Sequence, residues 1–154
     1  MHRINLLSLP LIGFFALAAC NPLADFTANA KEAEALIERF QAHHSRADLD
    51  AMYAMTSEAF REETQRGQFD EFADIVAKRL GPVEASEQVG FNVNAGTAGT
   101  STIVTMQTTF EQGEGTETYT FTGSGTDMRL QGWQVNSDRL MVSAEDLEAL
   151  ENTP

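Results

Sequence analysis

The stretch Phe72–Val93, "FADIVAKRLGPVEASEQVGFNV", contains the point at which the spacing of the apolar residues changes. Before Gly81 they recur every three or four positions, as on one face of a helix, and after Pro82 they recur every second position, as in a strand. Glycine favours the cap that follows a helix, and proline cannot continue one. The sequence therefore predicts a helix that ends just before Gly81 and a strand that begins at Val83.

Three more helical segments are expected before this junction. The first has one apolar face, formed by Ala33, Leu36, Ile37 and Phe40. Asp48 and Ser57 each precede a short apolar pattern and have the side chains that cap helices, so two short helices should follow them. The segment "ETQRGQ", residues 63–68, should then be a loop before the helix that ends the series.

After the junction, three further alternating segments and two Gly-rich turns predict strands. In the first strand the alternation places Val83, Glu87 and Phe91 on one face, which we expect to point inward. The pattern slips by one position near Gly123, where we expect a bulge or a bend. A turn at 131–132 should lead into a last strand that extends to residue 142, and a short helix over 144–151 should end the chain.

Helices followed by four strands with short connections predict the α+β class, with the helices on one face of a four-stranded, curved antiparallel sheet. The chain has 154 residues, of which 42% are hydrophobic, and this is enough for one packed core. Its single cysteine excludes an internal disulfide. We expect one domain over residues 31–152.

The first 19 residues are typical of an export signal: one basic residue, a short apolar run and small residues at the end. The run is shorter than the roughly 20 apolar residues that span a membrane. It ends in "LAAC", Leu17–Cys20, which resembles the lipobox of bacterial lipoproteins. A plain secretory signal and an uncleaved anchor are the alternatives.

The lipoprotein resemblance implies cleavage between Ala19 and Cys20, with acyl chains attached to Cys20. More than one chain gives stable anchoring in a membrane. Residues 20–30 would then be a tether, and the domain would face the periplasm. Asn21 is not the aspartate that retains some lipoproteins in the inner membrane, so the resemblance favours the outer membrane.

The formal net charge of −13 excludes nucleic acid as a partner, because such a surface repels phosphates. The same argument excludes a basic patch as the contact with anionic lipids. The partners that we expect are therefore the membrane, through the attached lipid, and an envelope protein or a second copy of the chain.

The segments "RLGPV", Arg79–Val83, and "GWQV", Gly132–Val135, together with the order of elements, resemble small secreted bacterial domains of the nuclear-transport-factor-two-like, cystatin-related cone fold. The resemblance covers residues 31–142 and implies a curved sheet that encloses a pocket. Members of that superfamily include isomerases, hydrolases, ligand-binding domains and assembly modules, so the resemblance implies a fold more than a function.

The candidate pocket residues are few. Tyr53, Tyr119 and Trp133 are large aromatic residues on apolar faces, and Glu87 is an acid at a position expected to point inward. The adjacent His43 and His44 point about 100° apart on a helix, so they cannot share a metal ion, and charge at a helix end explains them. We expect no metal and no cofactor.

The sequence thus predicts a lipid-anchored envelope protein that binds a protein partner or a small apolar ligand and is not an enzyme. One alternative is an enzyme of the same superfamily with Glu87 or His44 as the base. The other is a structural subunit that dimerises through its sheet.

Overall fold

A computed structural model describes residues 22–97 and 99–141 of the protein. Four α-helices precede four β-strands, and this confirms the predicted α+β class. The helices are α1 (Pro22–His44), α2 (Leu49–Ala54), α3 (Glu58–Glu63) and α4 (Arg66–Leu80). The strands are β1 (Val83–Gly96), β2 (Gly99–Phe110), β3 (Gly113–Thr122) and β4 (Arg129–Asn136), and two short 3₁₀ turns are η1 (Gly125–Asp127) and η2 (Asp138–Leu140).

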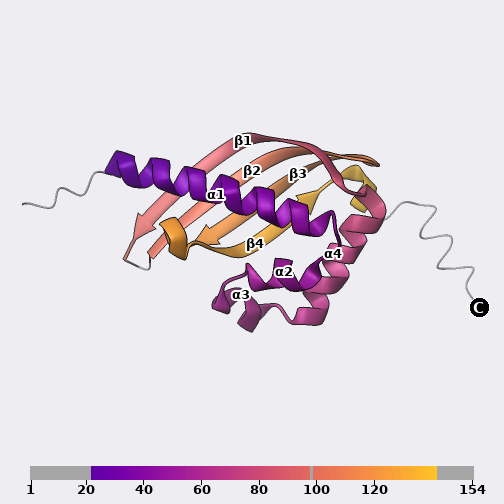
Figure 1. Ribbon diagram of the computed structural model, residues 1–154, viewed down its shortest axis with the longest axis horizontal. Helices are drawn as coiled ribbons and strands as arrows, with labels where there is room; N and C mark the ends of the chain where they lie inside the picture. The colour runs from indigo at the N-terminus through magenta and orange to yellow at the C-terminus, as the bar shows by residue number, and fades with distance from the viewer. Residues whose placement is uncertain (1–21, 98, 142–154) are drawn as a thin grey trace, which may run out of the picture.

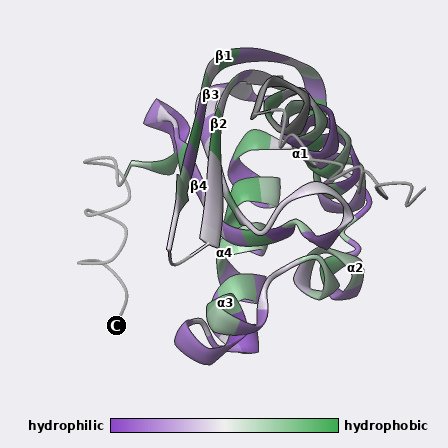
Figure 2. Ribbon diagram, turned by 90° about the vertical axis from the view of Figure 1, so that its left-hand side faces the viewer, coloured by the Kyte–Doolittle hydropathy of each residue, from purple (hydrophilic) through white to green (hydrophobic). Residues whose placement is uncertain are grey.

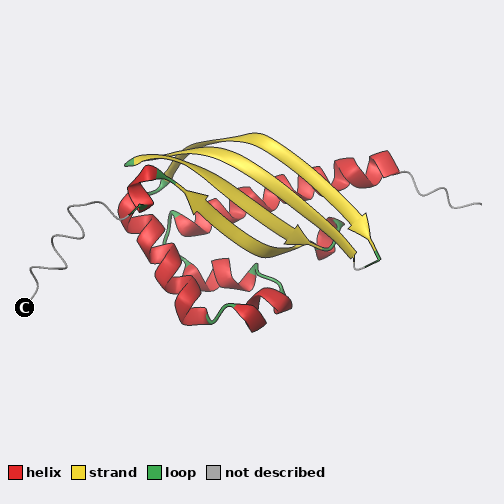
Figure 3. Ribbon diagram, turned by 180° about the vertical axis from the view of Figure 1, so that it is seen from behind, coloured by secondary structure: helices red, strands yellow, loops and turns green. Residues whose placement is uncertain are grey.

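The strands form one open antiparallel sheet in the order β1-β2-β3-β4. The sheet curves over α1, which lies along its concave face, while α4 crosses one end (Figures 1 and 3). Seen edge-on, the four helices lie on one side of the sheet (Figure 2). The core between the two layers contains Phe40, Met52, Val76, Leu80, Val104, Phe110, Phe121 and Leu130, among others. Among the described residues, the helices therefore cover one face of the sheet.

The expected helix ends are confirmed where a side chain or a glycine defines them. Asp48 Oδ1 accepts from the Ala51 amide at 3.2 Å at the start of α2. Ser57 caps α3 in the same way, and Gly81 follows α4 with a φ of 76°. The expected loop at 63–68 is mostly helical, because α4 begins at Arg66. Glutamines at 65 and 68 form the capping box here, where serine or threonine is the usual signal.

The first helix is longer than its apolar pattern. It begins at Pro22, so most of the segment expected as a tether is helical. Proline suits the first position of a helix because its missing N–H would have no partner there. This extension places Asn29 beside the sheet, as described below.

The inward position expected for Glu87 is wrong, and two bulges in β1 explain why. The pairing with β2 shifts between Val83 and Ala85, and again between Gln88 and Gly90, so that β1 has one extra residue at each place. A single extra residue moves the following side chains to the other face of the sheet. Glu87 is therefore exposed on the outer face, opposite Gln107.

The connection between β3 and β4 also differs from the expectation. The chain turns at residues 123–128, where Gly123 and Gly125 have φ values of 87° and 52°. The predicted turn at 131–132 lies inside β4, at a register shift. A bend at the glycines was expected, but the strand that was expected to continue through it ends at Thr122.

Several expectations lie outside the described residues: the signal over 1–19, the lipidation at Cys20, and the helix over 144–151. Within residues 22–97 and 99–141, no helix has the length and apolar character that crossing a membrane requires.

Candidate functional site

Among residues 22–97 and 99–141, one carboxylate is buried in the interior. Glu117, on the inward face of β3, is 1% exposed. Its Oε1 accepts from the Tyr119 hydroxyl at 2.7 Å and from the Trp133 indole N–H at 2.9 Å. Its Oε2 accepts from the Gln41 amide and the Thr108 hydroxyl, each at 2.7 Å. We call these five residues the Glu117 cluster.

The cluster joins the helical layer to three strands. Tyr119 follows two residues after Glu117, and therefore points to the same face of β3. Trp133 is the partner of Tyr119 in β4, and Thr108 comes from β2. Gln41 reaches the carboxylate from α1. The buried acid thus fixes how α1 lies on the sheet.

All hydrogen-bonding capacity of the carboxylate is used within the cluster. A carboxylate has about four lone-pair sites, and four donors occupy them here. Burial, followed by the charge of Glu117 and the hydrogen bond to it, raises the pKa of the Tyr119 phenol well above 10.0, so the phenol keeps its proton and donates. This arrangement positions side chains and leaves no free acceptor for a substrate proton.

His44, which the sequence offered together with Glu87 as an alternative base, is also in the interior. It is 4% exposed, and its Nε2 lies 3.2 Å from the backbone oxygen of Ala73, to which it can only donate. The centroid of its ring lies 5.4 Å from the centroid of the Trp133 ring, and the two rings are arranged edge to face. Burial lowers the pKa of His44, and the hydrogen bond to Ala73 and the charge of Glu117 only partly oppose this effect. His44 is therefore a neutral packing residue beside the Glu117 cluster.

The four predicted pocket residues separate into three places. Tyr119 and Trp133 come together at the Glu117 cluster. Tyr53 lies half-buried between α2 and α4, against Phe69. Glu87 is on the outer face. The alternation of side chains in β3 is a signal that could have identified Glu117, because a residue two positions before Tyr119 points to the same face of the sheet.

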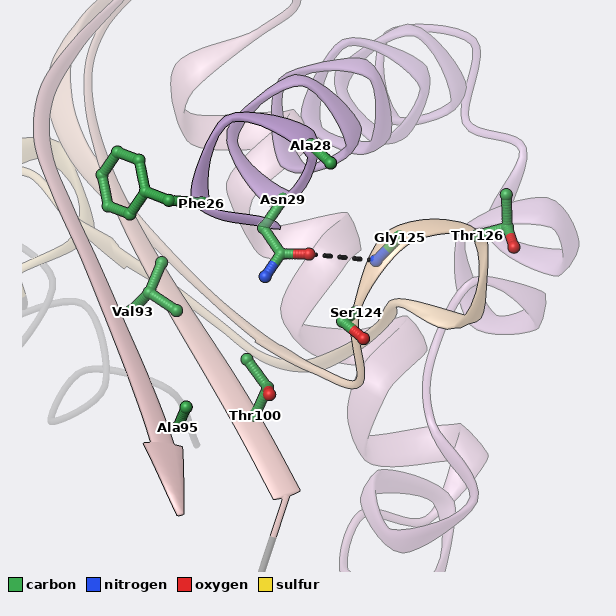
Figure 4. A pocket seen from close by; sticks show the side chains of 9 residues that line it. All are labelled: Phe26, Ala28, Asn29, Val93, Ala95, Thr100, Ser124, Gly125 and Thr126. Atoms are coloured by element: carbon green, nitrogen blue, oxygen red, sulfur yellow. Dashed lines mark hydrogen bonds between the residues drawn. The ribbon is translucent and has the colours of Figure 1, made fainter. Parts of the chain in front are cut away.

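A cleft of about 570 Å³ opens at the other end of the sheet (Figure 4). Its walls come from the first turns of α1, the ends of β1 and β2, and the turn after β3. It is lined by Phe26, Ala28, Asn29, Val93, Ala95, Thr100, Ser124, Gly125 and Thr126. We call it the end cleft. None of these nine residues is charged.

Asn29 holds the end cleft together. Its side-chain oxygen accepts from the Gly125 amide at 3.0 Å and so connects α1 to the turn after β3 (Figure 4). Phe26 on the same helix meets Phe91 of β1 edge to face at 5.1 Å. No sequence pattern indicated a role for Asn29, because it lies in the segment expected to be a tether.

A second hollow, of about 310 Å³, lies between α1 and β1. Gln41 lines it and also donates to Glu117, so the Gln41 amide separates this hollow from the carboxylate. Three acids, Glu34, Glu38 and Glu84, are also part of its wall. Within the described part of the chain, no group of three or more histidine, cysteine or acidic side chains is placed to hold a metal ion.

No protein-family model matches this chain, and no curated protein matches it either.

Proposed function

We propose that this protein is a lipid-anchored protein of the bacterial cell envelope that binds a small uncharged ligand in the end cleft. The acyl chains on Cys20 would hold it in the membrane, periplasm-facing and in the outer membrane. Its function would be to bind this ligand, and it would not catalyse a reaction.

The observation that carries this proposal is the absence of charge from the described residues that line the end cleft. The chain carries 23 acidic and 10 basic Lys or Arg residues, so the nine uncharged residues of the lining contrast with the rest of the protein. A volume of about 570 Å³ is within the range of small-molecule sites, which are mostly apolar with a few placed polar groups. Asn29, Thr100 and Ser124 are such polar groups.

The buried acid Glu117 and the predicted base His44 support binding over catalysis, and Glu87, the other predicted base, is exposed on the outer face. Neither Glu117 nor His44 lines the end cleft. All four hydrogen-bonding sites of Glu117 are occupied within its cluster, and the Nε2 proton of His44 is donated to the backbone. A general base must be within hydrogen-bond reach of the proton that it takes.

The architecture supports the proposed fold family. Helices along the concave face of a curved four-stranded meander are what the resemblance to the nuclear-transport-factor-two-like cone fold implies. The lipid anchor is supported by the "LAAC" segment alone.

Binding in the end cleft is tested with Nile red, a neutral dye that fluoresces in apolar surroundings. The full chain with Cys20→Ala is used, because it lacks the lipidation site and needs no detergent. We expect saturable binding that Ala95→Asp weakens and Asn94→Asp does not, since neighbouring side chains of β1 point to opposite faces. Absence of saturable binding, or equal effects of the two substitutions, would contradict the proposal.

The anchor is tested separately by membrane fractionation. Cys20→Ala should move the protein from the membrane fraction to the soluble fraction, because only the lipid is proposed to attach it. Unchanged fractionation would refute lipidation at Cys20, while the Nile red result would stand.

A further inference from the structure

The side chain of Asn29 presents a hydrogen-bond donor to the end cleft. The Gly125 amide can only donate, so the oxygen of Asn29 must face it, and the amide nitrogen Nδ2 must face the other way. Figure 4 shows this nitrogen turned toward the strands, on the side of Val93 and Thr100. Asn29 is 5% exposed, and the hydrogen bond that its side chain forms among residues 22–97 and 99–141 is the one that the oxygen accepts from Gly125.

A buried polar atom without a partner among the described residues lies close to the end cleft. Thr102 follows Thr100 on the same face of β2 and pairs with Val93, and both of these neighbours line the cleft. Thr102 is 0% exposed, and its hydroxyl makes no hydrogen bond within the described part of the chain. Buried polar groups are rarely left unpaired, and each one that is found calls for an explanation.

The donor and its surroundings define the chemistry of a ligand that fits the end cleft. Nδ2 needs an acceptor. The acceptor should be neutral, because none of the described residues that line the end cleft is lysine or arginine, and the chain has a net charge of −13. Phe26 and Val93 provide an apolar wall beside the donor. A carbonyl oxygen on a hydrocarbon chain meets all three requirements.

We propose that the end cleft binds neutral acyl esters, with the ester carbonyl accepting from Asn29 Nδ2 and the hydrocarbon chain lying along Phe26 and Val93. This inference rests on the proposed function, because it names the ligand class of the same cleft. Asn29 is the residue that selects for the carbonyl.

Two sources supply this chemistry: a free lipid, and the acyl chains attached to Cys20 itself. Asn29 stands nine residues after Cys20 in the sequence. The two sources are distinguished by the NMR signals of the Asn29 side-chain amide protons. If these signals in the lipidated protein match those of the ester-bound Cys20→Ala chain, the source is the protein's own lipid. If they match the ligand-free chain, the source is a free lipid.

The proposal is tested with monodecanoylglycerol and its ether analogue monodecylglycerol, which lacks only the carbonyl oxygen. Each competes with Nile red on the full Cys20→Ala chain, below the concentration at which it forms micelles. One hydrogen bond should make the ester bind roughly threefold to tenfold more tightly than the ether. Equal affinities would overturn the inference and leave the binding function intact. Absence of Nile red binding would refute the proposed function itself.

Asn29→Asp assigns the preference to a residue. The aspartate keeps an oxygen for the Gly125 amide but replaces the donor nitrogen, so the preference for the ester should disappear. Asn92→Asp is the matched control: Asn92 is exposed on β1, outside the end cleft, and its oxygen also accepts one hydrogen bond, from Asn94. A preference that survives Asn29→Asp would overturn the role of Asn29. The ester-to-ether ratio of the chain without these substitutions decides the ligand class even if the variant does not fold.

Discussion

Replacing Glu117 by leucine removes both acceptor oxygens of the Glu117 cluster while keeping a side chain of similar length. The Gln41 amide and the Thr108 hydroxyl each retain a second contact, with the Ser86 hydroxyl, at 3.1 and 3.2 Å. For the Tyr119 hydroxyl and the Trp133 N–H, Glu117 Oε1 is the acceptor, and the substitution removes it. Two of the four donors therefore lose their acceptor inside the protein.

The size of the effect follows from these two groups. A buried donor that loses its partner costs about 1–3 kcal/mol, so two of them cost about 2–6 kcal/mol. Small domains have total stabilities of about 5–15 kcal/mol. Glu117→Leu should therefore be among the severe substitutions in this protein.

Glu117→Gln should be milder, because the cluster can adapt to an amide. The new side-chain oxygen can accept from Tyr119 and Trp133 as before. The new amide nitrogen would face Gln41, whose own amide can rotate to present its oxygen, because the Ser86 hydroxyl can donate as well as accept. Hydrogen bonds to neutral groups are weaker than those to charged groups, so we expect a loss of about 1–2 kcal/mol.

Urea unfolding measures both losses, with the fluorescence of the only tryptophan as the signal. Glu87→Leu is the matched control, because the same substitution on the exposed outer face should change the free energy of unfolding by at most about 0.5 kcal/mol. If Glu117→Leu lowers the free energy of unfolding no more than Glu117→Gln does, the loss of an acceptor for Tyr119 and Trp133 is not the main effect, and the reasoning is refuted.

Three further predictions concern single features of the core and the turns. The pKa of His44 is lowered from its ordinary value of 6.5, chiefly by burial, so the unfolded chain binds more protons than the folded chain below that value. The free energy of unfolding should therefore fall as the pH drops from about 6.5 toward the lowered pKa. His44→Gln should reduce this dependence on pH, as measured by urea titrations at several pH values. Trp133→Phe keeps an aromatic ring but loses the N–H that donates to the buried carboxylate, and circular dichroism should show a loss of about 1.5–3 kcal/mol; a loss below about 0.5 kcal/mol would mean that this bond adds nothing. Gly123→Ala should lower the melting temperature strongly, because the new Cβ would lie 2.7 Å from the backbone oxygen of Asp127. Gly67→Ala in α4 is the control: its Cβ would meet no atom within 4 Å, and it should raise the melting temperature. Similar effects of the two substitutions would contradict the role of the positive φ at Gly123.

The local signals in the sequence predicted the helix ends well. Asp48, Ser57 and Gly81 define boundaries through contacts with residues close in sequence, and the structure confirms all three. The alternation in β2 and β3 was equally reliable, because these strands pair with each other without a register shift. Where a rule depends on neighbours in sequence, the chain alone is enough.

The site residues depended on distant partners and were mostly missed. The alternation in β1 predicted an inward position for Glu87. The prediction failed because the bulges are features of the pairing with β2 and leave no mark in the sequence of β1. Glu117 shares the inward parity of Tyr119, but an acid there is stable only because donors arrive from α1, β2 and β4. Asn29 has a role only through Gly125, 96 residues further along the chain. No short window of sequence contains these pairs.

The two bulges in β1 have a consequence for self-association. β1 is an outer strand of the open sheet, and the far side of such a strand is where another copy could add itself and start a growing aggregate. The extra residues at the two register shifts break the regular spacing of its backbone groups. An incoming strand could form hydrogen bonds with β1 over only short segments between the bulges. The same bulges that turn Glu87 to the outer face therefore also protect the protein from edge-to-edge polymerisation.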